Sequence, residues 1–479
     1  MATQVVVVGA GPGGYVAALK AASLGAKVTV VERAQVGGTC LHWGCIPTKA
    51  LRASAMALDT AKRLREYGIT PGGEPAPDLM AIMARKQKVV DTQTLGIERL
   101  FQAWGVEMVS GRARLDGAGR LAVTPPEGSP FTLNYERLIL APGSEAVDLP
   151  GLERDGKTVI NSDDALGLSE IPASLLIVGG GVVGCELAFI FNAFGSQVTL
   201  VEALDRLLPI PSLDTECSKL LLREMKKRGI TVYTGRVCAS LSRDAQGADT
   251  VLEPTPGSEA KGKAAQPLAV RAEKVLVSVG RRPAAEGLGL AEAGLEMDRG
   301  AVLVDHHLAA GPNIYAVGDV LGPRRPLLAH MASAEAKAAA ANALGGQELV
   351  DYAVVPAVAF TAPEVAWVGL SLEQAGELGL EAEASSFMPR GLGMAQALGE
   401  LAGIIKLVHE KGSGRLLGAH LMGAHAGEMV HECALALRLG ASVSDLAHTI
   451  HAHPTMSEAV AEASEDALGQ CLHAQPPKK

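Results

Sequence analysis

Two cysteines that lie close together are the first candidates for chemistry. Cys40 and Cys45 are five residues apart in the run Gly37-Gly-Thr-Cys-Leu-His-Trp-Gly-Cys-Ile-Pro-Thr-Lys49. A zinc site usually needs two such pairs, or a pair plus a histidine at ligand spacing, and His42 between the cysteines is poorly placed. Two unrelated structural thiols are a second alternative. The pattern favours a redox-active pair at the start of a helix, where the helix dipole lowers a thiol pKa.

A histidine near the end of the chain is the candidate for the proton acceptor that thiol chemistry needs. Neutral histidine suits that task near pH 7. Among twelve histidines, His453 is preferred because Pro454 constrains the chain after it and Glu458 follows five residues on. A carboxylate can orient such a base. The alternative is a structural His-Pro turn, and we expect the nearby His451 to be structural.

The elements that must position these residues begin with a repeat. Residues 5–33 and 175–203 align at an offset of 170, with identical residues at 10 of the 29 positions. Each copy has a short apolar run, a G-x-G-x-x-G motif, a helix-like stretch and a second apolar run that ends in glutamate. A single copy would be weak evidence, because a glycine-rich loop without a ligand has the same pattern. Two complete copies predict two β–α–β units that each bind a dinucleotide.

Each glycine of the motif has its own physical task. The first makes a tight turn, the second lets the backbone approach a pyrophosphate, and the third lets the helix pack closely on the strand. The residues are Gly9, Gly11 and Gly14 in the first copy and Gly179, Gly181 and Gly184 in the second. The unpaired N–H groups at the helix N-terminus attract the phosphates.

The acidic residue that ends each copy bears on the choice of nucleotide. Glu32 and Glu202 each follow the first glycine by 23 residues, where a carboxylate can accept hydrogen bonds from ribose hydroxyls. Glu202 would repel a 2′-phosphate, and Ala203 beside it offers no positive charge. The second copy therefore favours NAD over NADP, although Arg206 lies nearby.

The composition excludes several classes of protein. The 479 residues include 43 basic and 52 acidic side chains, a net charge of −9, and only 3% aromatic residues, which disfavours nucleic-acid binding. Seven cysteines are too few, and odd in number, for a secreted disulfide framework. No secretory leader precedes the first apolar run, and the apolar stretch 175–194 predicts a strand–turn–helix rather than a membrane span. We expect a cytoplasmic protein without a metal, membrane or nucleic-acid partner.

The segment GGTCLHWGCIPTKAL at 37–51 resembles the active-site disulfide motif of the pyridine nucleotide–disulfide oxidoreductases of class I. Further segments resemble that family along essentially the whole chain. They are Val277-Ser-Val-Gly-Arg-Arg-Pro283, Ile314-Tyr-Ala-Val-Gly-Asp319, Leu328-Ala-His330, Phe360-Thr-Ala-Pro-Glu-Val-Ala-Trp-Val-Gly369 and His451-Ala-His-Pro-Thr-Met-Ser-Glu458. Within the family, the chain is most similar to the branch that oxidises dihydrolipoamide, the E3 components.

This resemblance implies an α/β fold with two Rossmann-like dinucleotide-binding domains and a C-terminal α+β dimerisation domain. Residues 1–149 and 278–347 would form the FAD domain, residues 150–277 the NAD domain, and residues 348–479 the dimerisation domain. The enzyme would be a homodimer that oxidises protein-bound dihydrolipoamide to lipoamide and reduces NAD+ to NADH. Its partner would be a lipoyl-carrying protein of a 2-oxoacid dehydrogenase or glycine-cleavage system.

The resemblance also implies roles for individual residues. Cys40 would be the outer thiol that exchanges with dihydrolipoamide, and Cys45 the inner thiol that faces the flavin and forms the charge-transfer state. Lys49 would lie near the flavin and pair with Glu186. His453, held by Glu458, would be the base that completes the active site of the other subunit.

The cofactor-binding residues follow by the same resemblance. Those expected to contact FAD are Gly9, Gly11, Gly14, Glu32, Thr39, Lys49, Ala113, Gly143, Asp319, Ala329 and His330. Those expected to contact NAD are Gly179, Gly181, Val182, Val183, Gly184, Glu202, Val237 and Gly280.

Some positions depart from the family pattern. His42 and Trp43 replace the usual Asn-Val pair between the cysteines, Pro142 replaces a threonine, and Met331 replaces a lysine. A tryptophan beside the disulfide bears on the identity of the natural dithiol more than on the reaction type. Outside these motifs, we expect residues 244–267 to form a surface hairpin or loop and the tail 475–479 to be frayed.

Alternative functions remain within and outside the enzyme class. Mercuric reductase is disfavoured because the C-terminus carries only Cys471 and lacks a vicinal pair, and glutathione reductase because Glu202 and Ala203 suit NAD. A non-catalytic FAD-binding scaffold would have little reason to keep the two cysteines together with Lys49 and the histidine–glutamate pair.

Overall fold

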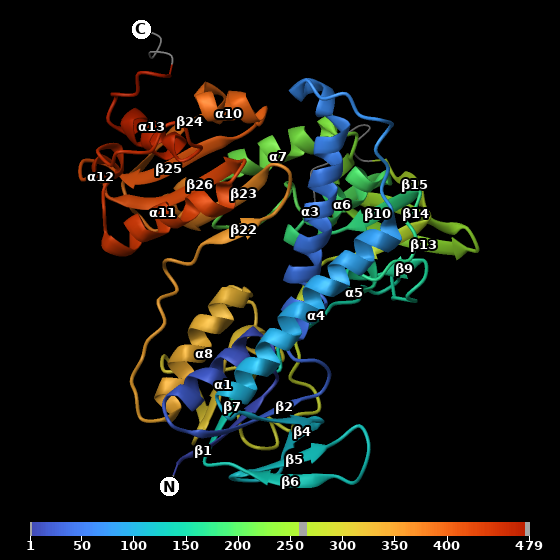
Figure 1. Ribbon diagram of the computed structural model, residues 1–479, viewed down its shortest axis with the longest axis vertical. Helices are drawn as coiled ribbons and strands as arrows, with labels where there is room; N and C mark the ends of the chain where they lie inside the picture. The colour runs from blue at the N-terminus through green and yellow to red at the C-terminus, as the bar shows by residue number, and fades with distance from the viewer. Residues whose placement is uncertain (1, 258–265, 475–479) are drawn as a thin grey trace.

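Three large β-sheets, each packed against helices, make up the computed structural model, which describes residues 2–257 and 266–474 (Figure 1). This architecture confirms the predicted α/β fold class. We propose that the units meet at the boundaries predicted from the sequence, after residues 149, 277 and 347.

The first sheet contains six strands in the order β20-β21-β7-β1-β2-β3. The strands are β1 (Gln4–Val8), β2 (Lys27–Glu32), β3 (Glu107–Ser110), β7 (Arg137–Leu140), β20 (Ala309–Gly311) and β21 (Ile314–Ala316). All neighbours are parallel except β20 and β21. The apolar run 5–8 is at most 5% exposed because helices α1 (Pro12–Ser23) and α8 (Ala329–Ala343) share this core. A small antiparallel sheet of β4 (Arg112–Leu115), β5 (Arg120–Thr124) and β6 (Phe131–Asn134) adjoins it.

The second sheet contains five parallel strands in the order β12-β11-β10-β16-β9. They are β9 (Val159–Ile160), β10 (Ser174–Val178), β11 (Gln197–Glu202), β12 (Thr231–Thr234) and β16 (Lys274–Val277). Its helices are α5 (Ser162–Ala165), α6 (Val182–Phe194) and α7 (Thr215–Lys227). Gln4 pairs with Lys27 and Ser174 pairs with Gln197, so the offset of 170 in the sequence repeat is also an offset of the strand register.

An antiparallel sheet of β13 (Arg236–Asp244), β14 (Gly247–Pro254) and β15 (Leu268–Ala272) extends from the second unit (Figure 1). The prediction of a surface hairpin or loop at 244–267 is confirmed for the described residues, because β13 and β14 form an antiparallel hairpin that turns between Asp244 and Gly247. Ala248 and Leu252 are buried against the core of the unit, because alternate residues of β14 face inward. Residues 258–265 of that segment, and the tail 475–479, lie outside the described part of the chain.

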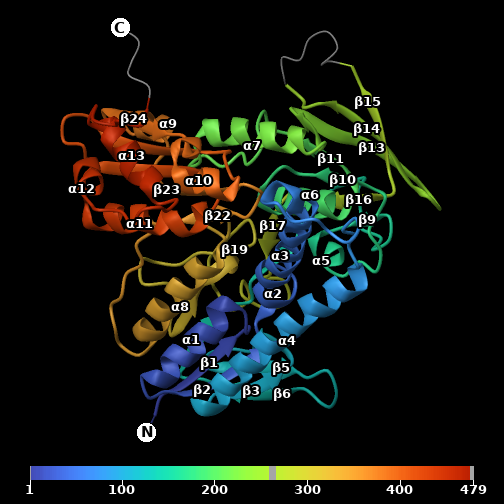
Figure 2. The same cartoon turned by 45° about the horizontal axis from the view of Figure 1, so that its top comes forward.

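The third sheet is antiparallel, in the order β22-β23-β26-β25-β24. Its strands are β22 (Ala357–Ala359), β23 (Glu364–Gly369), β24 (Ala382–Phe387), β25 (Ile404–Glu410) and β26 (Leu416–Gly423). The helices are α9 (Leu372–Glu377), α10 (Gly393–Leu398), α11 (Ala426–Leu439), α12 (Val443–Ala447) and α13 (Glu458–Ala467). Figure 2 shows this unit at one end of the molecule.

Smaller elements join these units. They are β8 (Ser144–Ala146) paired with β17 (Arg281–Pro283), β18 (Met297–Asp298) paired with β19 (Ala301–Val302), and the 3₁₀ helices η1 (Leu64–Tyr67), η3 (Gly318–Leu321) and η4 (Pro389–Gly391). In the described residues, no helix is both long and apolar enough to cross a membrane, and the apolar stretch 175–194 is divided between β10 and α6.

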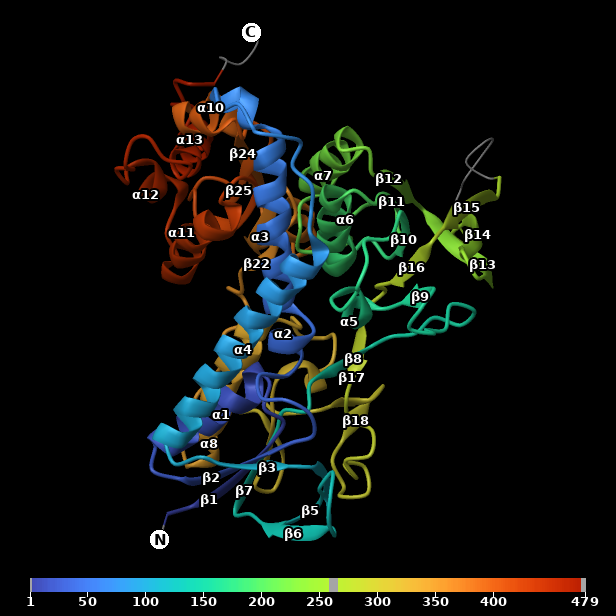
Figure 3. The same ribbon diagram turned by 45° about the vertical axis from the view of Figure 1, so that its right-hand side comes forward.

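The helix that follows the cysteine pair occupies the junction of the units. Helix α3 (Cys45–Lys62) follows the short α2 (Gly38–His42) and lies beside the long α4 (Leu79–Ala103), as Figure 3 shows. Leu51, Ala55 and Leu58 of α3 share one core with α6 and with strands β22 and β23. Helix α3 is therefore held by the second and third units as well as by the first.

Candidate active site

The two cysteines face each other across the break between α2 and α3. Cys45 is the first residue of α3, and Cys40 belongs to α2. Both are free thiols in this structure and share a hydrogen bond, so the structure describes the dithiol form. The break is tight, because a Cβ on Gly44 would lie 3.0 Å from the carbonyl oxygen of Thr39.

The two thiols differ strongly in acidity. The hydrogen bond from Cys40 lowers the pKa of Cys45 to about 7, burial opposes this effect, and the Lys49 ammonium lowers the pKa further. The same hydrogen bond, together with burial, raises the pKa of Cys40. A proton shared by two coupled thiols therefore resides on Cys40, and Cys45 carries the thiolate near neutral pH.

An ion pair lies next to the thiols. Lys49 Nζ lies 2.7 Å from Glu186 Oε2 and 3.0 Å from Glu186 Oε1. Glu186 belongs to α6 of the second unit and is only 3% exposed, whereas the Lys49 side chain is one-third exposed. The Glu186 carboxylate also accepts a hydrogen bond from the Phe360 amide at 2.9 Å. A carboxylate this deeply buried needs such partners, and they hold the ammonium near Cys45.

His42, one of the two unusual residues between the cysteines, is turned toward α4. His42 Nε2 lies 2.8 Å from the carbonyl oxygen of Val36 and 3.4 Å from Thr94 Oγ1. Trp43 ends α2, with its ring 5.4 Å from that of His42. In the described residues, no three His, Cys, Asp or Glu side chains gather in a way that could hold a metal ion.

The predicted base and its carboxylate form a pair in the third unit. His453 Nδ1 lies 2.8 Å from Glu458 Oε1, and the Thr455 amide donates to Glu458 Oε2 at 2.7 Å. Burial acts to raise the pKa of Glu458, but the Thr455 amide and His453 together lower it. The His453 side chain is 75% exposed, so its Nε2 is free to meet another surface.

A single chain does not bring this pair to the cysteines. His453 lies between α12 and α13, and Figure 2 shows these helices well separated from α2. His451, which we expected to be structural, has a carboxylate partner of its own, because its Nε2 lies 2.9 Å from Glu432 Oε1.

Each glycine motif forms a tight turn followed by a helix N-terminus, which we call a cradle, and the two cradles have matching geometry. A Cβ on Gly14 would lie 1.8 Å from the Gly9 carbonyl oxygen, and a Cβ on Gly184 would lie 1.9 Å from that of Gly179. Helix and strand therefore touch at these points, as the third glycine requires. A Cβ on Gly181 would meet no protein atom within 4 Å, so the space outside this helix N-terminus is open to a phosphate group.

The acidic residues are also held alike. Glu32 accepts hydrogen bonds from the amides of Ala10 at 2.6 Å and Ala34 at 2.8 Å. Glu202 accepts from the amides of Gly180 and Leu204 at the same distances. Each carboxylate is fixed at the end of the second strand of its β–α–β unit and can still accept hydrogen bonds from the hydroxyl groups of a ribose. Both cradles therefore fit a dinucleotide.

The Arg206 side chain is not positioned to bind the 2′-phosphate of a nucleotide in the second cradle. Its guanidinium donates to the carbonyl oxygens of Leu213 at 3.0 Å and Ile210 at 2.9 Å. This arrangement removes the one residue that weakened the preference for NAD.

The turn at Gly318–Asp319 is held by side chains that the sequence did not single out. Ser144 donates to Asp319 Oδ2 at 2.5 Å, and Arg281 Nε donates to Ser144 Oγ at 2.8 Å. The buried Glu335 accepts from the Gly318 amide at 2.7 Å. Arg281 lies in the segment 277–283 that resembles the family, but the sequence does not show its contact with Ser144. The pairing of β8 with β17 brings these two residues together.

The remaining predicted residues lie at several places along the elements. Ala329 and His330 begin α8, with His330 Nε2 2.8 Å from the Pro356 carbonyl oxygen. The others are Thr39 on α2, Ala113 on β4, Gly143 after β7, Val182 and Val183 at the start of α6, Val237 on β13 and Gly280 after β16. These assignments stay predictions.

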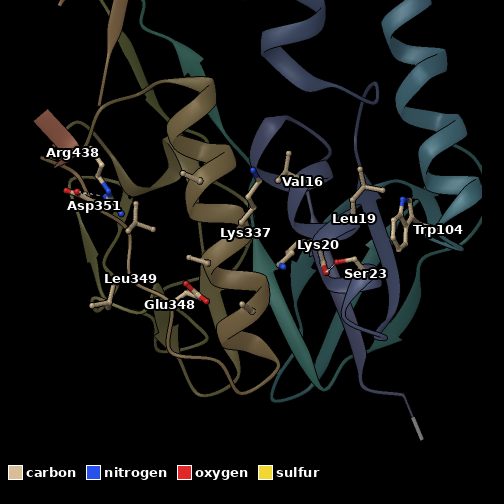
Figure 4. A pocket seen from close by; sticks show the side chains of 14 residues that line it. Val16, Leu19, Lys20, Ser23, Trp104, Lys337, Glu348, Leu349, Asp351 and Arg438 are labelled. Atoms are coloured by element: carbon tan, nitrogen blue, oxygen red, sulfur yellow. Dashed lines mark hydrogen bonds and ion pairs between the residues drawn. The ribbon is translucent and has the colours of Figure 1, made fainter. Parts of the chain in front are cut away.

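A separate groove of about 710 Å³ lies over α1, α8 and the segment 348–351 (Figure 4). Its lining includes Lys20, Lys337, Trp104 and Leu349, and none of the predicted site residues.

Comparison with known proteins gives two family matches that together cover most of the chain. Residues 3–336 match the pyridine nucleotide-disulphide oxidoreductase family, and residues 355–464 match the dimerisation domain of that family. The chain belongs to the pyridine nucleotide-disulphide oxidoreductases. The resemblance stated from the sequence is therefore confirmed.

Relatives and solved structures agree with this assignment. The dihydrolipoyl dehydrogenase of Chlorobaculum tepidum is 41% identical over 470 residues, which is 97% of either chain. That of Bacillus subtilis is 39% identical over 98% of this chain and 97% of its own. The crystal structure of LpdA from Mycobacterium tuberculosis matches with a TM-score of 0.86 at 27% identity, over 97% of this chain and 99% of its own.

Proposed function

We propose that this pyridine nucleotide-disulphide oxidoreductase is a dihydrolipoyl dehydrogenase that uses FAD and NAD. The observation that carries the proposal is the position of the thiol pair at the break before α3, with the Lys49–Glu186 pair beside it. The two dinucleotide cradles supply the cofactor sites, and full-length relatives of the chain have this activity in their names.

The acidity of the thiols supports the roles that we propose for the two sulfurs. When Cys40 and Cys45 form a disulfide, a thiolate of the dihydrolipoyl group attacks Cys40 Sγ, the S–S bond breaks, and Cys45 leaves as the thiolate. The sulfur with the lower pKa leaves faster, which favours Cys45 as the leaving group. Exposure alone does not assign the roles, since Cys45 is the more exposed of the two.

The second half of the exchange restores the balance of protons and electrons. A base takes the proton of the first, attacking lipoyl thiol. The second lipoyl thiol then attacks the lipoyl sulfur of the mixed disulfide, the bond to Cys40 Sγ breaks, and the proton of this second thiol passes to Cys40, so that lipoamide and the Cys40 thiol are released. FAD held by the first cradle would supply the two-electron acceptor that links the dithiol to NAD+. We assign the base to His453 of the partner subunit, because within one chain this residue lies far from α2.

The proposal includes a homodimer and a lipoyl-carrying protein of a 2-oxoacid dehydrogenase or glycine-cleavage complex. The match to the dimerisation domain supports the first, and the names of the relatives support the second. A cytoplasmic location stays a prediction from the sequence.

The direct test is an assay of the flavin-loaded protein. We expect it to reduce NAD+ with dihydrolipoamide and not to reduce glutathione disulfide with NADPH. Absence of lipoamide activity in protein with a full complement of flavin would contradict the proposal.

A cysteine substitution tests the thiol assignment. Cys45→Ser should abolish turnover while FAD stays bound, because the substitution removes the sulfur that reacts but leaves both cradles intact. Cys238→Ser, at a half-buried position on β13, is the matched control and should retain full activity. Loss of flavin from Cys45→Ser would instead indicate a structural role for Cys45.

A further inference from the structure

The turn that joins β22 to β23 contacts the redox helix at two successive positions. Phe360 lies against Lys49, and Glu364 binds Arg52 three residues further along α3. Figure 3 shows α3 beside both β22 and α6. The third unit therefore reaches the redox centre of its own chain, although its predicted base does not.

Phe360 interacts with both members of the Lys49–Glu186 pair. The Lys49 ammonium lies 4.5 Å from the centre of the Phe360 ring, within the range of a cation–π interaction. The Phe360 backbone amide donates to Glu186 Oε1 at 2.9 Å, on the same carboxylate that binds Lys49. Phe360 therefore contacts Lys49 through its ring and Glu186 through its backbone amide.

A second set of contacts fixes Phe360 itself. Arg52 Nη2 lies 2.8 Å from Glu364 Oε1, and Glu364 Oε2 accepts from the Gly427 amide at 2.9 Å, near the start of α11. The Arg52 guanidinium, about one turn further along α3 than Lys49, lies 5.6 Å from the Phe360 ring centre. The ring therefore lies between two cations of α3, and the loop that carries it is anchored to the third unit.

We propose that Phe360 is a positioning residue of the redox centre, which holds the Lys49–Glu186 pair at the distance that stabilises the Cys45 thiolate. This inference rests on the proposed function, but it concerns the thiol pair and not the identity of the dithiol substrate. Within one chain, the charged or titratable groups that act on Cys45 are Cys40 on α2, Lys49 on α3 and Glu186 on α6, and the proposed dimer adds His453 of the partner subunit. Phe360 is uncharged, so its effect must pass through Lys49 and Glu186.

The test is the pH dependence of the long-wavelength absorbance that a thiolate next to oxidised flavin produces in the two-electron-reduced holoenzyme. Phe360→Leu removes the ring face but keeps the backbone amide, and should shift the midpoint of this titration upward by about half a pH unit or more, because Lys49 stabilises the thiolate less well. Phe360→Tyr keeps the ring face and should match the unaltered protein. An unchanged midpoint in Phe360→Leu would overturn the proposal.

A double-mutant cycle separates positioning through Lys49 from general loosening of the fold. Lys49→Met alone should raise the midpoint, and Phe360→Leu added to Lys49→Met should produce no further shift. A full additional shift would show that Phe360 acts by another route and would also overturn the proposal.

Fluorinated phenylalanines at position 360 keep the test decisive if Phe360→Leu loses flavin. They weaken the negative potential of the ring face at nearly constant shape, so the midpoint should rise stepwise with the number of fluorines. A flat series would contradict the proposal. Because no lipoyl substrate is present in these titrations, they remain informative even if the protein acts on a different dithiol.

Discussion

At the scale of single residues, the chemistry depends on where protons are held. Cys45 has a pKa of about 7 and Cys40 keeps its proton, because the two share a hydrogen bond beside the Lys49 ammonium. The same principle applies to the base, since Glu458 holds His453 through Nδ1 and leaves the other ring nitrogen exposed. A carboxylate in this position fixes the tautomer and stabilises the protonated ring.

The chain offers a matched pair of histidines with which to test the role of Glu458. Glu458→Gln should lower kcat/KM for dihydrolipoamide by roughly a hundredfold, because the base loses its negatively charged partner. Reduction of a non-thiol dye by NADH should be unchanged, since that reaction does not use His453. Glu432→Gln alters the partner of His451 in the same way and should leave both activities near their normal values. Equal losses in the two variants would indicate structural roles for both carboxylates.

At the scale of elements, two β–α–β units of the same register are those that we propose to bind FAD and NAD. Each has one contact between helix and strand that leaves no room for a side chain, at Gly14 and at Gly184. Each also has a carboxylate held by two amides at the end of its second strand. The packing glycine and the phosphate-facing glycine of one motif thus have separable functions.

Alanine substitutions in the second motif should separate these functions. Gly184→Ala places a Cβ 1.9 Å from the Gly179 carbonyl oxygen, and the displacement of α6 should cost ~1–3 kcal/mol of stability. Gly181→Ala is compatible with the backbone, whose φ is −72°, and meets no protein atom within 4 Å. Its methyl group should instead obstruct the pyrophosphate and raise the KM for NAD+ about tenfold, which is ~1.4 kcal/mol.

Thermal denaturation of the two variants, together with NAD+ saturation curves, checks both expectations. The first variant should melt at a lower temperature, and the second at the normal temperature. A stable Gly184→Ala protein, or normal NAD+ affinity in Gly181→Ala, would contradict the assignment of the two glycines.

At the scale of the whole molecule, the proposed active site is divided between distant parts of the fold. The cysteines and the Lys49–Glu186 pair lie at the junction of the three units, whereas His453 lies between α12 and α13, which Figure 2 shows apart from α2. A two-fold symmetric dimer can bring each histidine to the cysteines of the other chain. Dimerisation would then be part of the mechanism.

Hybrid dimers test this arrangement. Cys45→Ser and His453→Ala should each be inactive as homodimers. A heterodimer that contains one subunit of each kind should recover about half of the wild-type activity, because one of its two sites combines an unaltered Cys45 with an unaltered His453. If the histidine served its own chain, the heterodimer would be inactive, since each subunit would carry one lesion. Differently tagged subunits allow the heterodimer to be purified and assayed.

The sequence by itself determined the features whose cause lies in neighbouring residues. The two G-x-G-x-x-G turns, the apolar strands on either side of them and the cysteine pair before a helix are all short-range patterns, and the structure has the β–α–β elements at the predicted offset of 170. The pairing of Lys49 with Glu186 came from family resemblance, since no local pattern links residues 137 positions apart. The sequence also predicts a hairpin or loop at 244–267, but which residues of β14 are buried follows only from the packing of that strand on the second unit.

Only the tertiary structure decided which neighbours those residues acquire. The pKa of Cys45 depends first on the hydrogen bond from Cys40, on burial and on Lys49, and then on Glu186. Cys40 and Lys49 are sequence neighbours of Cys45, but Glu186 and the Phe360 amide that binds it reach this site only through the packing of α3 against α6 and the β22–β23 turn. The same packing holds the cysteines at the junction of the units and leaves His453 between α12 and α13, so that in the proposed dimer a second chain would complete the site.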